Sequence, residues 1–242
     1  MTALVDGKRQ RTLVDAHSCG ALTDAHAHDS TELDSVLEHW SGVLHATADL
    51  TSSLVEFMKH DVRATPNPRN PRTFLKRKQC TFVLPGVRHY KFGQYNQHFV
   101  SDTSEWPTLV ERAFSIARAR APDPSLYTGV HVNLYVDGGV GVAPHSDKEE
   151  SMVHGQPIYS FTVLEDSDTP RPFSVYSRDG VKLRDVMLHD GDLLIMKGSM
   201  QDRFLHGIEK HKPARAFRAR VNLTVRAFAP LRGSPAPSPS LS

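Results

Sequence analysis

The chain has 242 residues and a formal net charge of +2, with 39% hydrophobic and 23% charged residues. This composition is typical of a soluble globular protein, and the length suits one domain with a sizeable core. No apolar run is long enough to cross a bilayer, which argues against a membrane protein. The two cysteines and the absence of an apolar leader favour a reducing intracellular compartment, either nucleus or cytoplasm, over secretion.

The N-terminal part is predicted to be partly helical. Residues 1–29 show no sustained periodicity and are expected to be poorly ordered. Over residues 30–64, apolar side chains recur at helical spacing after a capping Ser30 or Thr31, which predicts a helical extension packed outside the main domain. The three prolines between Thr65 and Arg72 then break any helix and predict a loop.

The remaining segment, residues 65–228, reads mainly as short strands. One helix is predicted after Pro107, where apolar residues return at helical spacing until Pro122-Asp123-Pro124. Beyond it, short apolar runs alternate with glycine turns, and the predicted strands are 131–136, 159–164, 172–176, 192–196 and 220–228. Together these elements predict an α+β, mainly β domain of the sandwich or jelly-roll type, followed by a disordered tail at 229–242.

One group of residues has the composition of an iron site. His145 and Asp147 are separated by a single residue, so at a strand end both side chains can converge on one ion. His206 is a polar residue inside the apolar run Phe204 to Ile208, which indicates an inward-facing ligand. Two imidazoles and one carboxylate leave half of an octahedral iron(II) open for a bidentate co-substrate and dioxygen. His145, Asp147 and His206 are therefore the candidate metal ligands.

A second group has the composition of an anion site. The segment Arg220 to Arg226 alternates polar and apolar residues, so a β-strand would place two guanidiniums, an amide and a hydroxyl on one face. A guanidinium matches the geometry of a carboxylate, which predicts a dicarboxylate co-substrate such as 2-oxoglutarate. A solvated edge strand is the alternative, but its polar face would more often carry Lys or Glu. The candidate co-substrate residues are Asn133, Tyr135, Arg220, Asn222, Thr224 and Arg226.

Residues 69–99 form a basic and aromatic segment that predicts nucleotide recognition. Cations neutralise phosphates, and aromatic faces stack on unpaired bases. Some of the aromatics, Phe82 above all, are expected to belong to the core instead. The cations are Arg69, Arg72, Lys76, Arg77, Lys78, Arg88 and Lys91, and the aromatics are Phe74, Phe82, Tyr90, Phe92 and Tyr95.

Four motifs stand in one order along the chain. They are Asn-x-Tyr from residue 133, His-x-Asp from residue 145, a distal histidine at residue 206, and Arg-x-Asn-x-Thr-x-Arg from residue 220. With Arg-Lys-Gln at 77–79, they resemble the AlkB family of iron(II) and 2-oxoglutarate-dependent dioxygenases, which act on alkylated nucleic acid bases. The resemblance covers about residues 77–228. It implies a double-stranded β-helix (jelly roll), the cofactor Fe(2+), and the co-substrates 2-oxoglutarate and O2.

The resemblance also implies a role for each motif residue. The three candidate ligands would bind iron, Arg220 would hold the remote carboxylate of 2-oxoglutarate, and Arg226 would lie nearer the iron. The residues implied to contact a flipped base are Arg77, Tyr90, Phe92 and Glu149. The implied reaction is oxidative dealkylation of an N-alkylated base in DNA or RNA, releasing aldehyde, succinate and CO2, and we expect the enzyme to act as a monomer.

Other functions remain open at this stage. The same fold could hydroxylate a protein side chain, although a protein hydroxylase would have no need of the basic aromatic segment. A non-catalytic binding module would have no need of three metal ligands. The segment from Asp24 to Asp29 resembles the Asp-x-His-x-His motif of metal-dependent amidohydrolases, with His26 and His28 on zinc. That family folds as a (β/α) barrel, which the consecutive strands do not predict.

Overall fold

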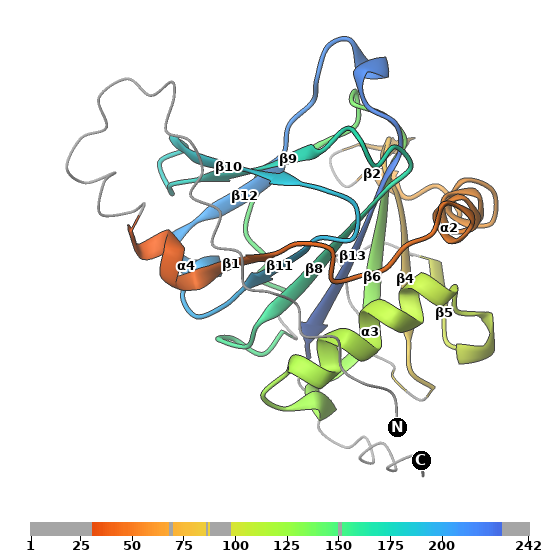
Figure 1. The fold of residues 1–242 in the computed structure, drawn as a ribbon, viewed down its shortest axis with the longest axis horizontal. Helices are drawn as coiled ribbons and strands as arrows, with labels where there is room; N and C mark the ends of the chain where they lie inside the picture. Colours follow the sequence, from red (N-terminus) through yellow and green to blue (C-terminus); the bar gives the residue numbers. More distant parts are fainter. Residues whose placement is uncertain (1–30, 68–69, 86, 88–97, 150–151, 229–242) are drawn as a thin grey trace.

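Two β-sheets face each other and form a jelly roll (Figure 1). The computed structural model of the chain describes residues 31–67, 70–85, 87, 98–149 and 152–228. The predictions for residues 1–29 and 229–242, and those that involve His26, His28, Tyr90 and Phe92, lie outside these ranges. Within the described ranges no (β/α) barrel is present, and no helix is long and apolar enough to span a membrane.

The larger sheet has seven strands and the smaller sheet has four. In spatial order, the larger sheet consists of β1 (Leu37–Trp40), β11 (Leu193–Met196), β8 (Ile158–Leu164), β13 (Arg220–Ala227), β6 (Tyr127–Tyr135), β4 (Lys78–Val83) and β5 (His98–Val100). The smaller sheet consists of β10 (Lys182–Leu188), β9 (Arg171–Tyr176), β12 (Leu205–Ile208) and β7 (Val142–His145). All neighbours are antiparallel except β4 and β5.

From β6 onward the chain alternates between the two sheets, except that β9 and β10 are consecutive neighbours in the smaller sheet. Strands β6, β8, β11 and β13 belong to the larger sheet, and β7, β9, β10 and β12 belong to the smaller one. Residues far apart in sequence therefore meet across the space between the sheets. This connectivity is that of a double-stranded β-helix, which confirms the predicted fold class.

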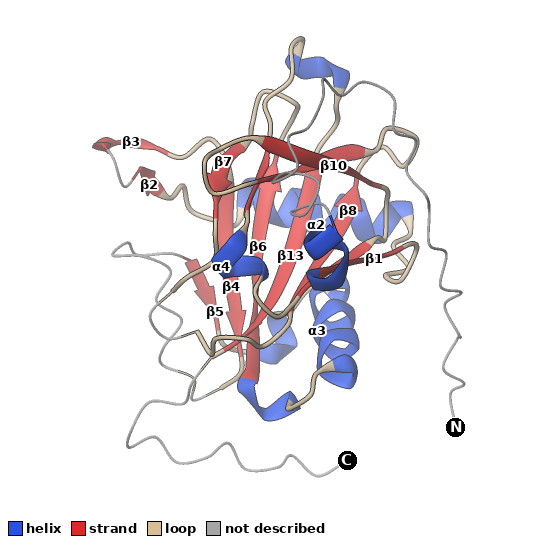
Figure 2. Ribbon diagram, turned by 90° about the vertical axis from the view of Figure 1, so that its left-hand side faces the viewer, coloured by secondary structure: helices blue, strands red, loops and turns tan. Residues whose placement is uncertain are grey.

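Two helices cover the outer face of the larger sheet (Figures 1 and 2). Helix α2 (Ala48–His60) begins after Thr47, whose side chain accepts a hydrogen bond from the Leu50 N–H, and α3 (Thr108–Arg120) follows Pro107 as predicted. Their apolar faces pack in one cluster with Val221, Leu223 and Val225 of β13. Because side chains alternate along a strand, this packing directs the polar residues of β13 toward the smaller sheet. The short helices are η1 (Thr103–Glu105), η2 (Pro124–Leu126), α4 (Met200–Arg203) and η3 (Ala214–Ala216).

The predicted helical extension is wrong for part of its length. Among the described residues before strand β1, those at 31–36 are helical, and the chain then becomes β1, which pairs with β11 at the edge of the larger sheet. The apolar residues that suggested a longer helix are buried all the same, Leu33 and Val36 before the strand and Leu37 within it. Pairing with β11 satisfies the backbone of β1, and this tertiary interaction outweighs helical propensity.

Asp192 fixes this edge of the sheet. Its buried carboxylate accepts hydrogen bonds from the Gly42 and His189 backbone N–H groups at 3.1 and 2.8 Å and contacts His39 Nε2 at 2.7 Å. Gly42 has a φ of +63°, a backbone conformation that favours glycine. The turn after β1 is therefore tied directly to the start of β11.

Two further elements were not predicted. The proline-rich segment expected to be a loop contains a hairpin of β2 (Pro66–Asn67) and β3 (Asn70–Phe74), which projects from the body of the molecule (Figure 2). Pro66 and Pro71 lie in a two-stranded sheet with free edges, where a missing N–H costs little. Strand β10 pairs with β9 alone, and this edge position explains its mixed sequence pattern.

We predict that Asp192→Ala lowers the free energy of unfolding by about 2 kcal/mol, because two backbone donors and His39 lose their buried acceptor. The exposed pair of Asp34 and Arg184 provides the control, and Asp34→Ala should change stability by less than about 0.5 kcal/mol. Urea denaturation followed by circular dichroism measures both. Equal stability losses in the two variants would contradict the anchoring role of Asp192.

Candidate active site

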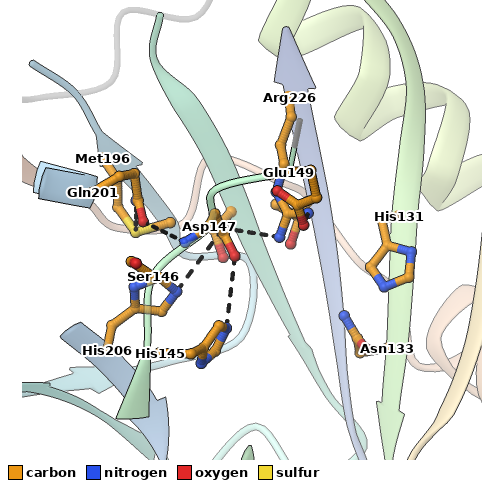
Figure 3. A network of polar contacts seen from close by, with 12 residues as sticks. His131, Asn133, His145, Ser146, Asp147, Glu149, Met196, Gln201, His206 and Arg226 are labelled. Atoms are coloured by element: carbon orange, nitrogen blue, oxygen red, sulfur yellow. Dashed lines mark hydrogen bonds and ion pairs between the residues drawn. The ribbon is translucent and has the colours of Figure 1, made fainter. Parts of the chain in front are cut away.

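The three predicted metal ligands meet between the sheets (Figure 3). His145 ends β7 and lies directly opposite His206 of the neighbouring β12, with their ring centroids 4.5 Å apart. Asp147 follows two residues after His145. One ligand atom from each of the three side chains lies within 4.8 Å of the other two.

The two imidazoles have lone pairs available for a metal. His145 Nδ1 lies 2.9 Å from the Ala143 carbonyl oxygen, which can only accept, so Nδ1 carries the proton and Nε2 is free. That Nε2 atom is 3.6 Å from Asp147 Oδ1. Burial lowers the pKa of His206 to about 3, so this ring is neutral at physiological pH. The His206 ring stacks on Phe173 at a centroid distance of 5.3 Å, which fixes its plane.

Asp147 supplies the negative charge of the site. Burial alone would raise its pKa, but the charge of the neighbouring Arg226 holds this pKa below its ordinary value. Arg226 Nη2 lies 2.8 Å from Asp147 Oδ2. An ionised carboxylate is the protonation state that a divalent metal requires of this ligand, and two nitrogens with one oxygen suit iron(II).

Gln201 of α4 holds the loop that carries Asp147. Its Oε1 accepts a hydrogen bond of 2.8 Å from the Asp147 backbone N–H, and its Nε2 lies 3.5 Å from the sulfur of Met196 (Figure 3). Arg178 donates to the Gln201 carbonyl oxygen and, at 3.4 Å, to Ser146 Oγ. The residue between the two metal ligands is thus connected to α4. No sequence pattern indicated Gln201, because its role depends on a contact between distant segments.

A cavity of about 250 Å³ extends from the metal ligands along the inner face of the larger sheet. Its wall consists of polar side chains in cross-strand rows. Asn222 of β13 lies between Asn133 of β6 and Thr162 of β8, and the next row contains His131, Thr224 and Ser160. Ser160 and Thr162 were not predicted, although two hydroxyl residues inside the apolar strand Ile158–Leu164 are a readable signal.

Arg220 provides an unpaired positive charge at one end of this wall. The residue is 2% exposed, its Nη2 donates to Thr162 Oγ1 at 3.1 Å, and its guanidinium lies over the Tyr135 ring at 5.2 Å. Burial lowers its pKa to about 10, which leaves it charged at neutral pH. Its Nε has no hydrogen-bond partner, and no described carboxylate pairs with it. A buried cation in this state favours an anionic ligand.

Asn222 and Thr224 are part of the sheet's own hydrogen-bond network. Asn222 Nδ2 donates to Ser160 Oγ at 2.8 Å and to the Phe161 carbonyl oxygen at 3.1 Å, and Thr224 donates to Asn222 Oδ1 at 2.8 Å. Their polar atoms are therefore largely used within the protein. Both residues line the cavity, together with Asn133, Tyr135, Arg220 and Arg226, so the structure brings all six predicted co-substrate residues to one wall.

Two of the predicted base-contacting residues are described, and both line the same cavity. Glu149 Oε1 pairs with Arg226 Nη1 at 2.9 Å, while its buried Oε2 has no hydrogen-bond partner. Arg77 Nε is likewise buried without a partner. Besides the metal ligands and the co-substrate residues, the described part of the cavity wall therefore contains an unused acceptor on Glu149 and an unused donor on Arg77.

One part of the basic segment does not act as predicted. Lys78 Nζ donates to the carbonyl oxygens of Lys59 and Val62, the latter at 3.0 Å. Lys78 thus binds the backbone near the C-terminal end of α2 and is not available to a phosphate. Phe82 is fully buried in the core, as expected.

The comparisons with known proteins agree with this geometry. The sequence matches the 2OG-Fe(II) oxygenase superfamily over residues 37–226. The chain belongs to this superfamily. The membership implies Fe(2+), 2-oxoglutarate and O2, with His145, Asp147 and His206 as the candidate iron site.

Two solved structures resemble the fold of this superfamily member. The structure of OsALKBH1 has a TM-score of 0.50 at 20% sequence identity, covering 79% of this chain and 96% of that one. A prolyl-4-hydroxylase from Pseudomonas putida has a TM-score of 0.47 at 12% identity, covering 85% of this chain and 99% of that one. A search of curated proteins gave no match.

We predict that Gln201→Ala weakens Fe(II) binding by about tenfold, because the Asp147 loop loses its hydrogen-bond acceptor. The control is Asp202→Asn at the next position, an exposed residue that pairs with Lys148. Titration of metal-free protein with Co(II), followed by its visible absorption, measures the affinity of each variant. A Gln201→Ala affinity equal to that of the control would contradict the proposed support.

Proposed function

We propose that this superfamily member is an AlkB-like enzyme that oxidatively dealkylates N-alkylated bases in DNA or RNA. The observation that carries the proposal is the pair of unused polar atoms in the cavity wall, Arg77 Nε and Glu149 Oε2. A nucleobase presents acceptors and donors side by side along one edge and can satisfy both atoms. An aliphatic side chain such as that of proline would leave both buried and unsatisfied, which is costly.

The surface next to the cavity supports the same substrate. The projecting β2–β3 hairpin, which carries the exposed residues Arg72 and Phe74, ends three residues before Arg77. Lys76, in the short link between the hairpin and Arg77, is exposed as well. Phe74 is 61% exposed. Cations beside an exposed aromatic ring suit a phosphate backbone and unstacked bases.

The co-substrate residues have separable tasks in this proposal. Arg220 binds the remote carboxylate of 2-oxoglutarate, since among the described residues that line the cavity it is the buried guanidinium with no carboxylate partner. Arg226 holds Asp147 and Glu149 at once, which joins a metal ligand to the proposed base contact. When bound, iron(II) and 2-oxoglutarate supply oxidation of the alkyl carbon by dioxygen, with aldehyde, succinate and CO2 as products. The enclosing sheets keep bulk water from the reacting carbon.

The proposed activity is tested with purified protein, Fe(II), ascorbate and 2-oxoglutarate on methylated single-stranded and duplex DNA and on methylated RNA. We expect formaldehyde release in proportion to succinate with at least one of these substrates, and no turnover by His145→Ala, which lacks a metal ligand. Succinate formation without formaldehyde from any nucleic acid would contradict the proposal. Turnover driven by a peptide would instead identify a protein hydroxylase.

We predict that Arg220→Met raises the KM for 2-oxoglutarate by about a hundredfold, because the co-substrate loses its charge-assisted hydrogen bonds. The KM for the nucleic acid should stay within about twofold, since the co-substrate and the base occupy different parts of the cavity. Arg215→Met, at an exposed arginine outside the cavity, is the matched control. Steady-state kinetics with each substrate varied in turn measures both constants. A larger change in the KM for nucleic acid would contradict the assignment.

A further inference from the structure

Gln79 of β4 contacts Asn133, one of the proposed co-substrate residues, on the neighbouring strand β6. It lies opposite Asn133 of β6 in the sheet register, and the next row of the same pair contains Thr81 and His131. Gln79 Nε2 is 3.0 Å from Asn133 Oδ1 and 3.3 Å from His131 Nε2, and Thr81 Oγ1 is 3.0 Å from His131 Nδ1. All four side chains are buried. They form a continuous hydrogen-bond chain that ends at Asn133.

The direction of this chain follows from the chemistry of its members. Burial, with the nearby charges of Arg226 and Arg77, holds the pKa of His131 well below its ordinary value, so the ring is neutral. A neutral imidazole has one donor and one acceptor nitrogen. The Gln79 amide nitrogen can only donate, so His131 Nε2 accepts from it and His131 Nδ1 carries the proton toward Thr81.

The same reasoning fixes the amide of Asn133. Since Gln79 donates to Asn133 Oδ1, that oxygen is used inside the sheet and the Asn133 Nδ2 donor is left over. The Asn133 side chain also has a hydrogen bond with His131, and it lines the cavity, so an Nδ2 hydrogen is available on the cavity side. In Figure 3 its nitrogen is turned toward β13, the strand of Arg220 and Arg226. An amide in the opposite orientation would present a carbonyl oxygen to an anion and repel it.

We propose that Gln79 is a positioning residue for the co-substrate: it holds the Asn133 amide with its donor facing 2-oxoglutarate, and His131 and Thr81 hold Gln79. The inference rests on the proposed assignment of Asn133 to 2-oxoglutarate. It does not depend on the identity of the primary substrate. Gln79 itself also lines the cavity, and the proposed role is its action through Asn133.

Two substitutions at residue 79 separate orientation from packing. Gln79→Met keeps the length of the side chain and removes both donors, so the Asn133 amide can rotate, and we expect the Kd for 2-oxoglutarate to rise about tenfold. Gln79→Glu offers only acceptors, so Asn133 turns its Nδ2 toward the carboxylate, and the expected rise is about a hundredfold. Isothermal titration calorimetry of the Mn(II)-loaded protein with 2-oxoglutarate, without nucleic acid or oxygen, measures both. In turnover, kcat at saturating 2-oxoglutarate should stay within about twofold.

Gln156→Met makes the same substitution at a residue outside the cavity and should leave the Kd unchanged. If both Gln79 variants unfold, Thr81→Val keeps the proposal testable, because it removes only the last member of the chain and should raise the Kd about threefold. Nitrogen-15 NMR of His131 reports the direction of the chain independently of binding. We expect the proton on Nδ1 in the wild type.

Either of two results would overturn the proposal. One is a Kd for 2-oxoglutarate within twofold of wild type in Gln79→Glu and Gln79→Met. The other is an Nε2-protonated His131, since the chain would then run in the reverse direction. Because no nucleic acid is present, a failure of the proposed demethylation activity leaves these measurements unaffected, and the two ideas fail separately.

Discussion

The buried ion pair between Arg226 and Asp147 joins the two halves of this site. Asp147 belongs to the loop after β7 in the smaller sheet, and Arg226 belongs to β13 in the larger sheet, with 2.8 Å between the paired atoms. A buried pair of this kind adds little net stability, because both ions lose their hydration. Its effect is organisational: it keeps Asp147 ionised and places the metal loop at a fixed position along the co-substrate strand.

The alternation of the chain between two sheets makes this arrangement possible. Strands β12 and β7 place the two histidines opposite each other, while β6, β13 and β8 align their polar side chains in rows. The outer helices bury the apolar residues of β13, so its polar residues have no position but the cavity. Packing on one face of the larger sheet therefore determines the chemistry on the other face.

Much of this site could be predicted from the sequence because its signals are local. A two-residue period in Arg220 to Arg226 is enough to assign one face of a strand, and His145 with Asp147 needs only a strand end. The contacts of Gln201, Gln79 and His131 could not be predicted in the same way. Each depends on the register between strands or on a loop that meets a distant helix, and register is a property of the assembled sheet. The strand β1 was predicted as helix for the same reason, since only its pairing with β11 decides between the two forms.

The residues that local sequence patterns predict and the residues that depend on the assembled structure also have different proposed functions. In the proposed function, residues of β13 and of the His-x-Asp motif serve the cofactor chemistry that membership of the superfamily implies. Substrate choice would then depend on what surrounds this centre, namely Arg77, Glu149 and the hairpin that carries Phe74. Arg77 directly precedes β4, Glu149 lies in the loop after β7, and the hairpin precedes Arg77, so all three lie outside the eight strands β6–β13 of the jelly roll. Arg77 and the hairpin can therefore change without disturbing the iron site, whereas Glu149 is joined to Asp147 through Arg226. Gln79 on the neighbouring β4 is the point at which changes at Arg77 would reach the proposed co-substrate residues.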